Sequence, residues 1–365
     1  MDTARSKTNL PSWIVVFVFV GAFWLFFDLI AMPSPALFGA LVGAMFFSIW
    51  GKLPSVTVTR PFFLVGQGLL GAIMGAYVDL PTLKALADHW VVVFGGSISI
   101  ILFSLLAGQL LARHPDVSKA TGTFSMIAGG ASGITAIARE LGADDRLVGV
   151  LQYLRILLIV FTTPLIASFV FKYERVDFVP SEDSAHVWQV ALFLLASVII
   201  GILLVRFVPF TGSTLLWPLL VAATISVSGV LGDVYVPNSV ATVAYLLIGL
   251  QVGLRFTRSS LIAIRRVFPL ALFLMILLNV VSALIGVVIS KVTGIGYLDT
   301  YLATTPGGIW AIVGVALESG SDVTFILSVQ VLRLMLVLFM SPFLANHFSK
   351  QLAAKGDDQS SMPRA

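Results

Sequence analysis

The sequence predicts an all-α polytopic membrane protein made of two inverted-topology repeats, with about ten transmembrane helices and two glycine-broken re-entrant segments. Composition supports this, because the 365 residues are 58% hydrophobic and only 11% charged, with mean hydropathy +1.01. Soluble domains carry nearer a quarter charged residues. Apolar runs of roughly 20 residues, each long enough to cross a bilayer, recur along the chain. One stretch also occurs twice.

The repeated stretch runs from Ala128 to Pro164 and again from Pro306 to Pro342. The copies align without a gap at a separation of 178 residues. Identical pairs include Gly129 and Gly307, Gly130 and Gly308, Glu140 and Glu318, Gly142 and Gly320, Asp144 and Asp322, Gln152 and Gln330, and Arg155 and Arg333. Two apolar segments share some leucines by chance, but not these polar residues at the same spacings. The pattern therefore indicates an internal duplication.

The first half comprises a polar tail (1–12) and a membrane repeat (13–171). Its expected helices are 13–31, 36–50, 62–78, 91–111 and 147–171. Gly71 and Gly75 form a small-xxx-small pair that permits close helix packing. The segment 119–140 is apolar but rich in glycine, which costs roughly 1 kcal/mol per helix position relative to alanine. It is therefore expected to break and re-enter, with its exposed backbone surrounded by protein or water.

The second half follows a polar connector (172–186) and comprises a membrane repeat (187–348) and a polar tail (349–365) that is expected to be disordered. Its expected helices are 187–207, 214–230, 240–254, 267–289 and 324–348. A second broken segment covers 297–318. The first apolar run lacks a small-residue cleavage site, so we expect it to be retained as a helix.

Corresponding loops carry opposite charge bias. Lys52 and Arg60 precede the third helix, where the second half has only Asp233. After the third helix, the second half carries Arg255, Arg258, Arg265 and Arg266, whereas the first half has Lys84 with Asp79 and Asp88. Because Lys and Arg mark cytoplasmic loops, the halves are expected to be inverted, with five crossings each and both termini cytoplasmic in a bacterial inner membrane. In the alternative topology the glycine-rich segments cross, which gives about twelve helices and parallel repeats.

Secondary transporters of this plan bind solute near the midplane, where broken helices meet the ligand. A freed helix N-terminus suits an anion. The candidate substrate-binding residues are Gly129, Gly130, Ser132, Gln152, Arg155, Thr304, Thr305, Gly307, Gly308, Gln330 and Arg333. The candidate residues for coupling H⁺ or Na⁺ are Glu140, Asp144, Glu318 and Asp322.

Each candidate has a structural alternative. An arginine in mid-helix costs at least about 2.5 kcal/mol on insertion scales, so a partner is expected. Arg155 and Arg333 either bind a substrate carboxylate or phosphate, or pair with Glu140, Glu318 or the carbonyls of the broken helices. Asp144 and Asp322 either couple ions or cap helices.

Enzymatic chemistry is poorly supported, and no cofactor or metal is expected. The chain has no cysteine, which excludes thiolate chemistry and disulfides. Its four histidines show no metal-ligand spacing, and no Walker loop or dinucleotide fingerprint is present. The net charge of +4 is explained by cytoplasmic loops, so no nucleic-acid partner is expected.

The doubled motif G-G-x(9)-E-x-G-x-D-x(7)-Q-x-x-R-x(8)-P resembles the bacterial AbrB-type duplicated membrane family over essentially the whole chain. In that family a proline usually precedes the first glycine pair. Ala128 stands there in this chain, whereas Pro306 keeps the pattern in the second copy. Family members are often labelled putative ammonia monooxygenase or AbrB regulator. The first label implies copper or iron, for which clustered ligands are missing, and the second implies DNA binding, for which there is no soluble domain.

The leading hypothesis is a secondary transporter that moves a small organic, anionic solute by alternating access. The alternative is a non-transporting membrane regulator or sensor that acts through a partner protein. A metal oxygenase is a third, weaker hypothesis. The expected partners are the lipid bilayer, the solute and H⁺ or Na⁺, and assembly as a homodimer stays open.

Overall fold

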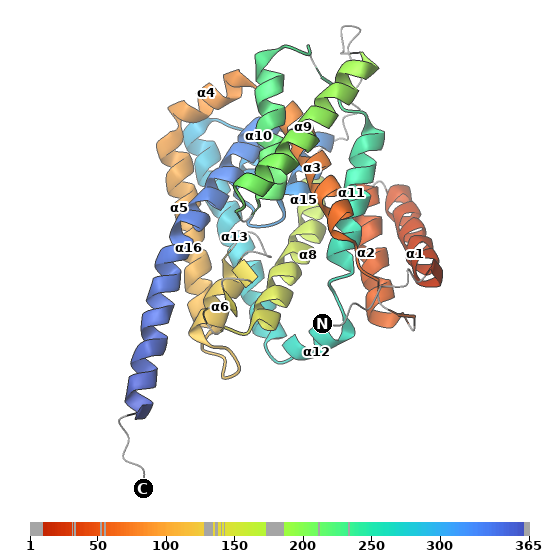
Figure 1. Ribbon diagram of the computed structural model, residues 1–365. Coiled ribbons are helices and arrows are strands. Elements are labelled where there is room, and N and C mark those ends of the chain that lie inside the picture. Colours follow the sequence, from red (N-terminus) through yellow and green to blue (C-terminus); the bar gives the residue numbers. More distant parts are fainter. Residues whose placement is uncertain are drawn as a thin grey trace. The chain divides into compact units, whose positions relative to one another are not determined.

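The computed structural model describes 10–30, 32, 34–51, 53–54, 56–127, 134–135, 138–139, 141, 143–172, 186–210, 212–232 and 234–360, without the side chains of 85, 310, 341–342 and 344–360. Throughout these residues the regular structure is helical and contains no strand (Figure 1). This agrees with the all-α prediction.

The helices of the first half are α1 (Leu10–Leu29), α2 (Pro35–Trp50), α3 (Arg60–Ala76), α4 (Leu80–Asp88), α5 (Trp90–Leu111), α6 (Lys119–Met126) and α8 (Asp145–Phe169). Those of the second half are α9 (Val187–Phe207), α10 (Ser213–Ser228), α11 (Asn238–Gly253), α12 (Arg258–Ile264), α13 (Phe268–Thr293), α14 (Tyr297–Thr304), α15 (Ile309–Glu318) and α16 (Val323–Ser360). Every long helix expected from the sequence is present, with ends shifted by a few residues.

Two features differ from the sequence prediction. The short helices α4 and α12 occupy segments that were expected to be loops, at corresponding positions of the two halves. Helix α16 continues to Ser360 and thus extends into the tail 349–365, which was expected to be disordered. That tail begins Ser-Lys-Gln-Leu-Ala-Ala-Lys, and lysine, glutamine, leucine and alanine are good helix formers, so a preceding helix propagates readily through them.

Six helices in the described part of the chain are long and apolar enough to cross a membrane: α1, α5, α8, α9, α13 and the first part of α16. The pairs α3–α4 and α11–α12 are each bent by more than 40°, and they raise the number to eight if each pair is one span. Helices α2 and α10 are apolar but only 16 residues long. The structure is therefore that of a multi-pass membrane protein.

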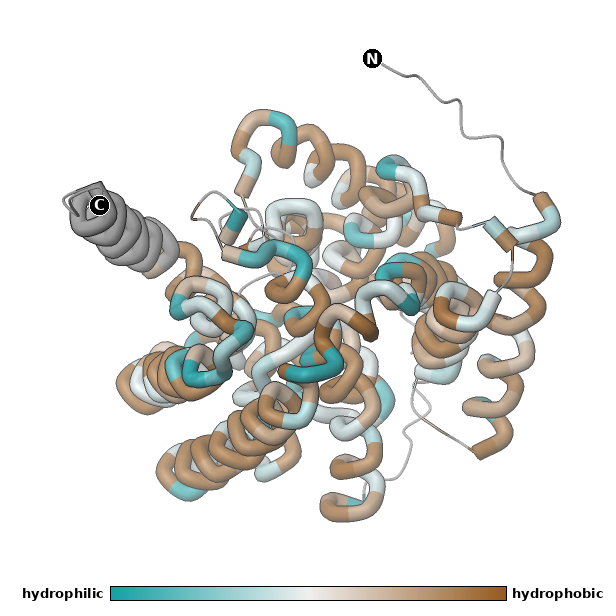
Figure 2. Tube along the Cα trace, turned by 90° about the horizontal axis from the view of Figure 1, so that it is seen from below, coloured by the Kyte–Doolittle hydropathy of each residue, from teal (hydrophilic) through white to brown (hydrophobic). Residues whose placement is uncertain are grey.

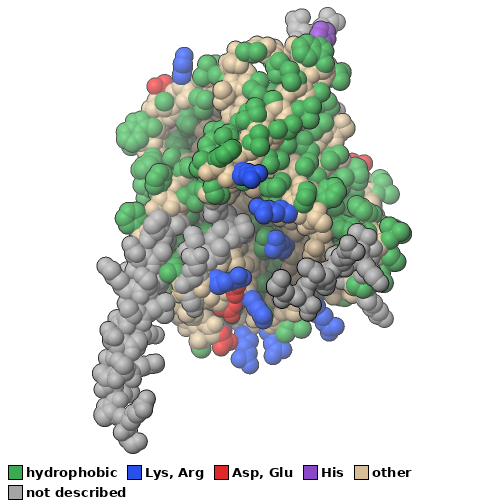
Figure 3. All heavy atoms as spheres, viewed as in Figure 1, with side chains coloured by type: hydrophobic (Ala, Val, Ile, Leu, Met, Phe, Trp, Pro, Cys, Tyr) green, Lys and Arg blue, Asp and Glu red, His purple; other side chains and the backbone are tan. Residues whose placement is uncertain are grey.

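The outward faces of these helices are apolar. On α9, Leu192, Leu195, Ile199 and Leu203 recur at helical spacing and are 48–58% exposed. Most helical turns are hydrophobic in Figure 2, and hydrophobic side chains cover much of the face in Figure 3. Apolar faces of this extent need an apolar solvent, which lipid supplies.

The chain packs as two units, each of which takes segments from both halves of the sequence. The first comprises Met1–Asp88, Ile156–Ala263 and Gly307–Leu327, and the second comprises His89–Arg155, Ile264–Pro306 and Ser328–Ala365. The division runs through α8 and α16, and it falls between α14 and α15.

In the first unit α1 packs on α2, α2 on α11, α3 on α10 and α11, and α9 on α10. The close packing expected at Gly75 is present, because a Cβ there would lie 2.5 Å from Leu219 O on α10. The same contact recurs at the matching position of the second half. A Cβ at Gly253, which lies 178 residues after Gly75, would collide with Leu41 O on α2. Both glycines allow two helix backbones to approach closely.

In the second unit α5 packs against α6 and α13, and α13 against α14. Its core contains Ile101, Phe124, Ile127, Val148 and Val337. This core surrounds the end of α6, which is where the repeated motif begins. Phe124 and Met126 at the end of α6 are accordingly buried within the protein.

Candidate functional site

The first copy of the motif closes around the carboxyl end of α6. The Gln152 amide on α8 donates to Phe124 O at 2.6 Å and to Ile127 O at 2.8 Å. One turn later, Arg155 Nη1 donates to Met126 O at 3.0 Å, and Nη2 donates to Gln152 Oε1 at 2.6 Å. Both side chains are buried. The glutamine and the arginine therefore act together on the last carbonyls of one short helix.

The second copy makes the same arrangement at the end of α14. The Gln330 amide donates to Leu302 O at 2.9 Å and to Thr305 O at 3.1 Å. Arg333 Nη1 donates to Thr305 O at 3.0 Å and approaches Thr304 O at 3.5 Å, while Nη2 donates to Gln330 Oε1 at 2.5 Å. These side chains are likewise buried.

The bonds correspond almost residue by residue at the separation of 178, since Phe124, Met126 and Ile127 match Leu302, Thr304 and Thr305. Their physical role is clear. The last four carbonyls of a helix have no partner within that helix, and they carry the negative end of its dipole. Inside a membrane such groups need donors, and a cation at this end is favourable. We call each Gln–Arg pair with its carbonyls a helix-end clamp.

The two clamps leave positive charge in the interior of the second unit. Arg155 and Arg333 are only 4% and 5% exposed. Among the described side chains, neither guanidinium forms an ion pair, and the Nε–H of each has no hydrogen-bond acceptor. Neutral carbonyls satisfy some of the donors but do not balance the charge.

The hydroxyl groups of Thr304 and Thr305, which were predicted to bind a substrate, donate hydrogen bonds to carbonyls of α14. Thr304 Oγ1 donates to Thr300 O and Thr305 Oγ1 donates to Tyr301 O, both at 2.8 Å, so these protons are given to α14 itself. The assignment of Thr304 and Thr305 to substrate binding stays a prediction. A threonine hydroxyl within a helix or at its end readily bonds the carbonyl four residues earlier.

Helix α15 begins directly after the second glycine pair and belongs to the first unit. Its N-cap is Gly308, and no side chain caps its first N–H groups among the described residues. Gly307 packs against Ile159 so closely that a Cβ would collide with that side chain. A helix N-terminus therefore follows the second break, as the glycine pair predicts. Gly129, Gly130, Ser132 and Glu140 lie outside the described residues.

The acidic candidates occupy two different environments. Asp144 Oδ1 accepts from the N–H of Leu147 at 3.0 Å, and Asp322 Oδ1 accepts from that of Phe325 at 2.9 Å, so both aspartates cap the helices that carry the clamps. Glu318 lies in the first unit, where Oε1 accepts from Ser34 N at 2.6 Å and from Ser34 Oγ at 3.2 Å. Within the described residues, no group of three metal-ligating side chains is present.

Comparison with known proteins identifies the family of this chain. Residues 43–349 match the family described as transition state regulatory protein AbrB. The chain is 28% identical over 326 residues to a putative regulator AbrB of Escherichia coli K12, which covers 87% of this chain and 91% of that protein. It is 27% identical over 301 residues to the uncharacterized protein YhjN of Bacillus subtilis 168, which covers 78% of each. Since the family match spans most of its length, the chain belongs to the AbrB family.

Proposed function

We propose that this protein is a secondary transporter that carries a small organic anion across the membrane by alternating access. The observation that supports the proposal most directly is the pair of helix-end clamps, which hold two arginines in the interior of one unit with no carboxylate partner among the described side chains. Buried charge is costly to maintain, and in membrane proteins it marks functional sites.

The chemistry of the clamps favours an anion. Each guanidinium uses Nη1 and Nη2 on neutral acceptors and keeps one Nε–H without an acceptor in the described structure. A carboxylate placed near these groups would form charge-assisted hydrogen bonds and balance the buried positive charge. Interrupted helices at membrane depth are the usual frame for such sites.

The proposed topology has ten crossings in two inverted repeats, with both termini in the cytoplasm of a bacterial cell. Helices α2, α3, α10 and α11 have 16 or 17 residues, which is at the short limit of about 17–25 for a span. The concentration of arginines at α12, compared with Lys84 alone in α4, supports inversion. Coupling to H⁺ or Na⁺, the absence of enzymatic activity and assembly as a homodimer belong to the same proposal.

The test is uptake into proteoliposomes that contain the purified full-length protein. A panel of radiolabelled mono- and dicarboxylates, phosphate esters and amines is screened with imposed H⁺ and Na⁺ gradients. We expect saturable uptake of an organic acid. Arg333→Gln should reduce it by about 10- to 100-fold, because a charged hydrogen bond is worth about 1.5–3 kcal/mol. The control is Arg206→Gln, which removes an exposed arginine in the last turn of α9.

A membrane regulator is the second candidate, and it is favoured by the name of the Escherichia coli relative, a putative regulator. It predicts no flux of any solute on the panel. It also predicts that Arg333→Gln changes the set of proteins recovered with the full-length chain, or the expression of genes in its host, while Arg206→Gln changes neither. Absence of flux together with such a change would replace the transporter proposal.

A further inference from the structure

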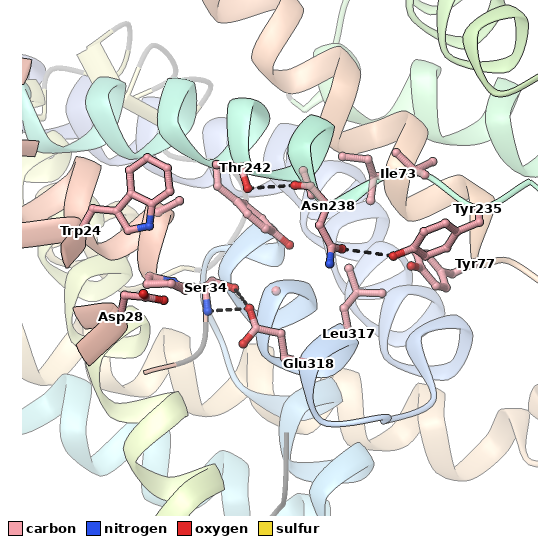
Figure 4. Close-up of a pocket in the computed structure, with 16 residues that line it drawn as sticks. Trp24, Asp28, Ser34, Ile73, Tyr77, Tyr235, Asn238, Thr242, Leu317 and Glu318 are labelled. Carbon is pink, nitrogen blue, oxygen red and sulfur yellow. Dashed lines mark hydrogen bonds between the residues drawn. The ribbon is translucent and has the colours of Figure 1, made fainter. Parts of the chain in front are cut away.

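A cavity in the first unit lies among helix ends that come from distant parts of the chain (Figure 4). Its volume is about 280 Å³. Trp24 and Asp28 reach it from α1, Tyr77 from the end of α3, and Glu318 from the end of α15. Tyr235 precedes α11, and Asn238, Thr242 and Tyr245 lie on that helix. None of the helix-end clamp residues lines this cavity.

The charged side chains that line the cavity are acidic. Asp28 and Glu318 line it, and the set of lining residues, all in the described part of the chain, contains no Lys, Arg or His. The carboxyl ends of α1, α3 and α15 lie at this cavity and contribute partial negative charge, whereas the amino ends of α2 and α11, which also line it, contribute partial positive charge. Glu318 is partly offset, since it accepts the Ser34 N–H before the first turn of α2. Asp28 forms no ion pair among the described side chains, and it is exposed in the last turn of α1.

Aromatic side chains supply the rest of the lining. Trp24, Tyr77, Tyr235 and Tyr245 surround the cavity from three segments of the chain. The polar groups of α11 already bond one another, because Thr242 Oγ1 donates to Asn238 O at 2.8 Å and Tyr235 OH bonds Asn238 Oδ1 at 3.4 Å (Figure 4). Aromatic rings beside a carboxylate attract a cation through the negative face of the ring.

We propose that this cavity binds a small organic cation with a quaternary or protonated amine, with Asp28 as counter-charge and Trp24 and the tyrosines as the aromatic wall. The volume is close to the lower end of the range for small-molecule sites, about 300–1,000 Å³, and far exceeds a bare ion. Aromatic cages of this composition are the usual receptors for quaternary ammonium groups. The proposal stands on this cavity alone and does not depend on the transport of an anion.

The experiment is isothermal titration of the purified full-length protein in detergent with choline and with 3,3-dimethylbutan-1-ol. The second compound is the neutral carbon isostere of choline, so only the positive charge differs. We expect saturable binding of choline, with the isostere at least about 10-fold weaker, which corresponds to about 1.4 kcal/mol. Equal binding of the two compounds, or no heat with choline, would overturn the proposal.

Two variants locate the site. Asp28→Asn and Trp24→Leu should each weaken choline binding by about 10-fold or more, since one removes the counter-charge and the other an aromatic face. Asp88→Asn and Trp90→Leu are the matched controls, because both residues are exposed and neither lines the cavity. A thermal melt of each variant establishes that it is folded. Choline affinity that stays unchanged in both Asp28→Asn and Trp24→Leu would refute the assignment.

Discussion

Replacing Gln330 by leucine tests whether the second helix-end clamp holds the broken helix α14. The change keeps the approximate size of the side chain and removes its amide. It abolishes the two bonds to Leu302 O and Thr305 O, at 2.9 and 3.1 Å, and the acceptor that Arg333 Nη2 uses at 2.5 Å. The carbonyls at the end of α14 then face the protein interior with fewer donors.

The expected cost follows from these three bonds. Hydrogen bonds between helices in membranes average about 0.6 kcal/mol and reach about 1.7 kcal/mol. A bond to a charged group is worth about 1.5–3 kcal/mol. Together they give a loss of about 3 to 6 kcal/mol in the free energy of unfolding, measured by SDS titration in mixed micelles.

The control for this prediction is Gln109→Leu, which makes the same chemical change on an exposed position of α5 in the same unit. It should change the unfolding free energy by no more than about 0.5 kcal/mol. If Gln330→Leu costs no more than Gln109→Leu, the clamp does not support α14. Gln152→Leu should behave like Gln330→Leu, because its bonds match those of the second copy.

Three further predictions concern packing, capping and topology. Gly249→Leu should force α11 away from the α2 backbone and cost at least about 1–3 kcal/mol, whereas Gly21→Leu, whose Cβ meets nothing within 4 Å, should leave the thermal melting temperature unchanged. Asp322→Ala removes the cap of α16 and should cost about 1 kcal/mol, while Asp322→Asn should retain most of that stability in the same melt. Reporter fusions after Gly51 and Ser260 should both report the cytoplasm, and opposite sides for these two positions would contradict the inverted repeats.

The positions of the long helices could be read from the sequence, because an apolar run of membrane length is a local property. Val187–Phe207 was expected at the residues where α9 lies, and the break between α14 and α15 was expected from Gly307 and Gly308. The pairing of Gln330 with Arg333 on one helix face also follows from their spacing of three residues. The short helix α4 was missed because residues 80–88 are too short and too polar to give a membrane signal.

Only the tertiary structure decided what these residues contact. From the sequence alone, the partner of Arg333 could be a carboxylate, a ligand or helix carbonyls. In the structure Arg333 on α16 donates to Thr305 O at the end of α14. No local sequence pattern predicts the cavity that Trp24 and Glu318 line, because these two residues lie almost 300 positions apart in the sequence. Helix formation depends on neighbours along the chain, whereas the choice of partner depends on how distant helix ends meet.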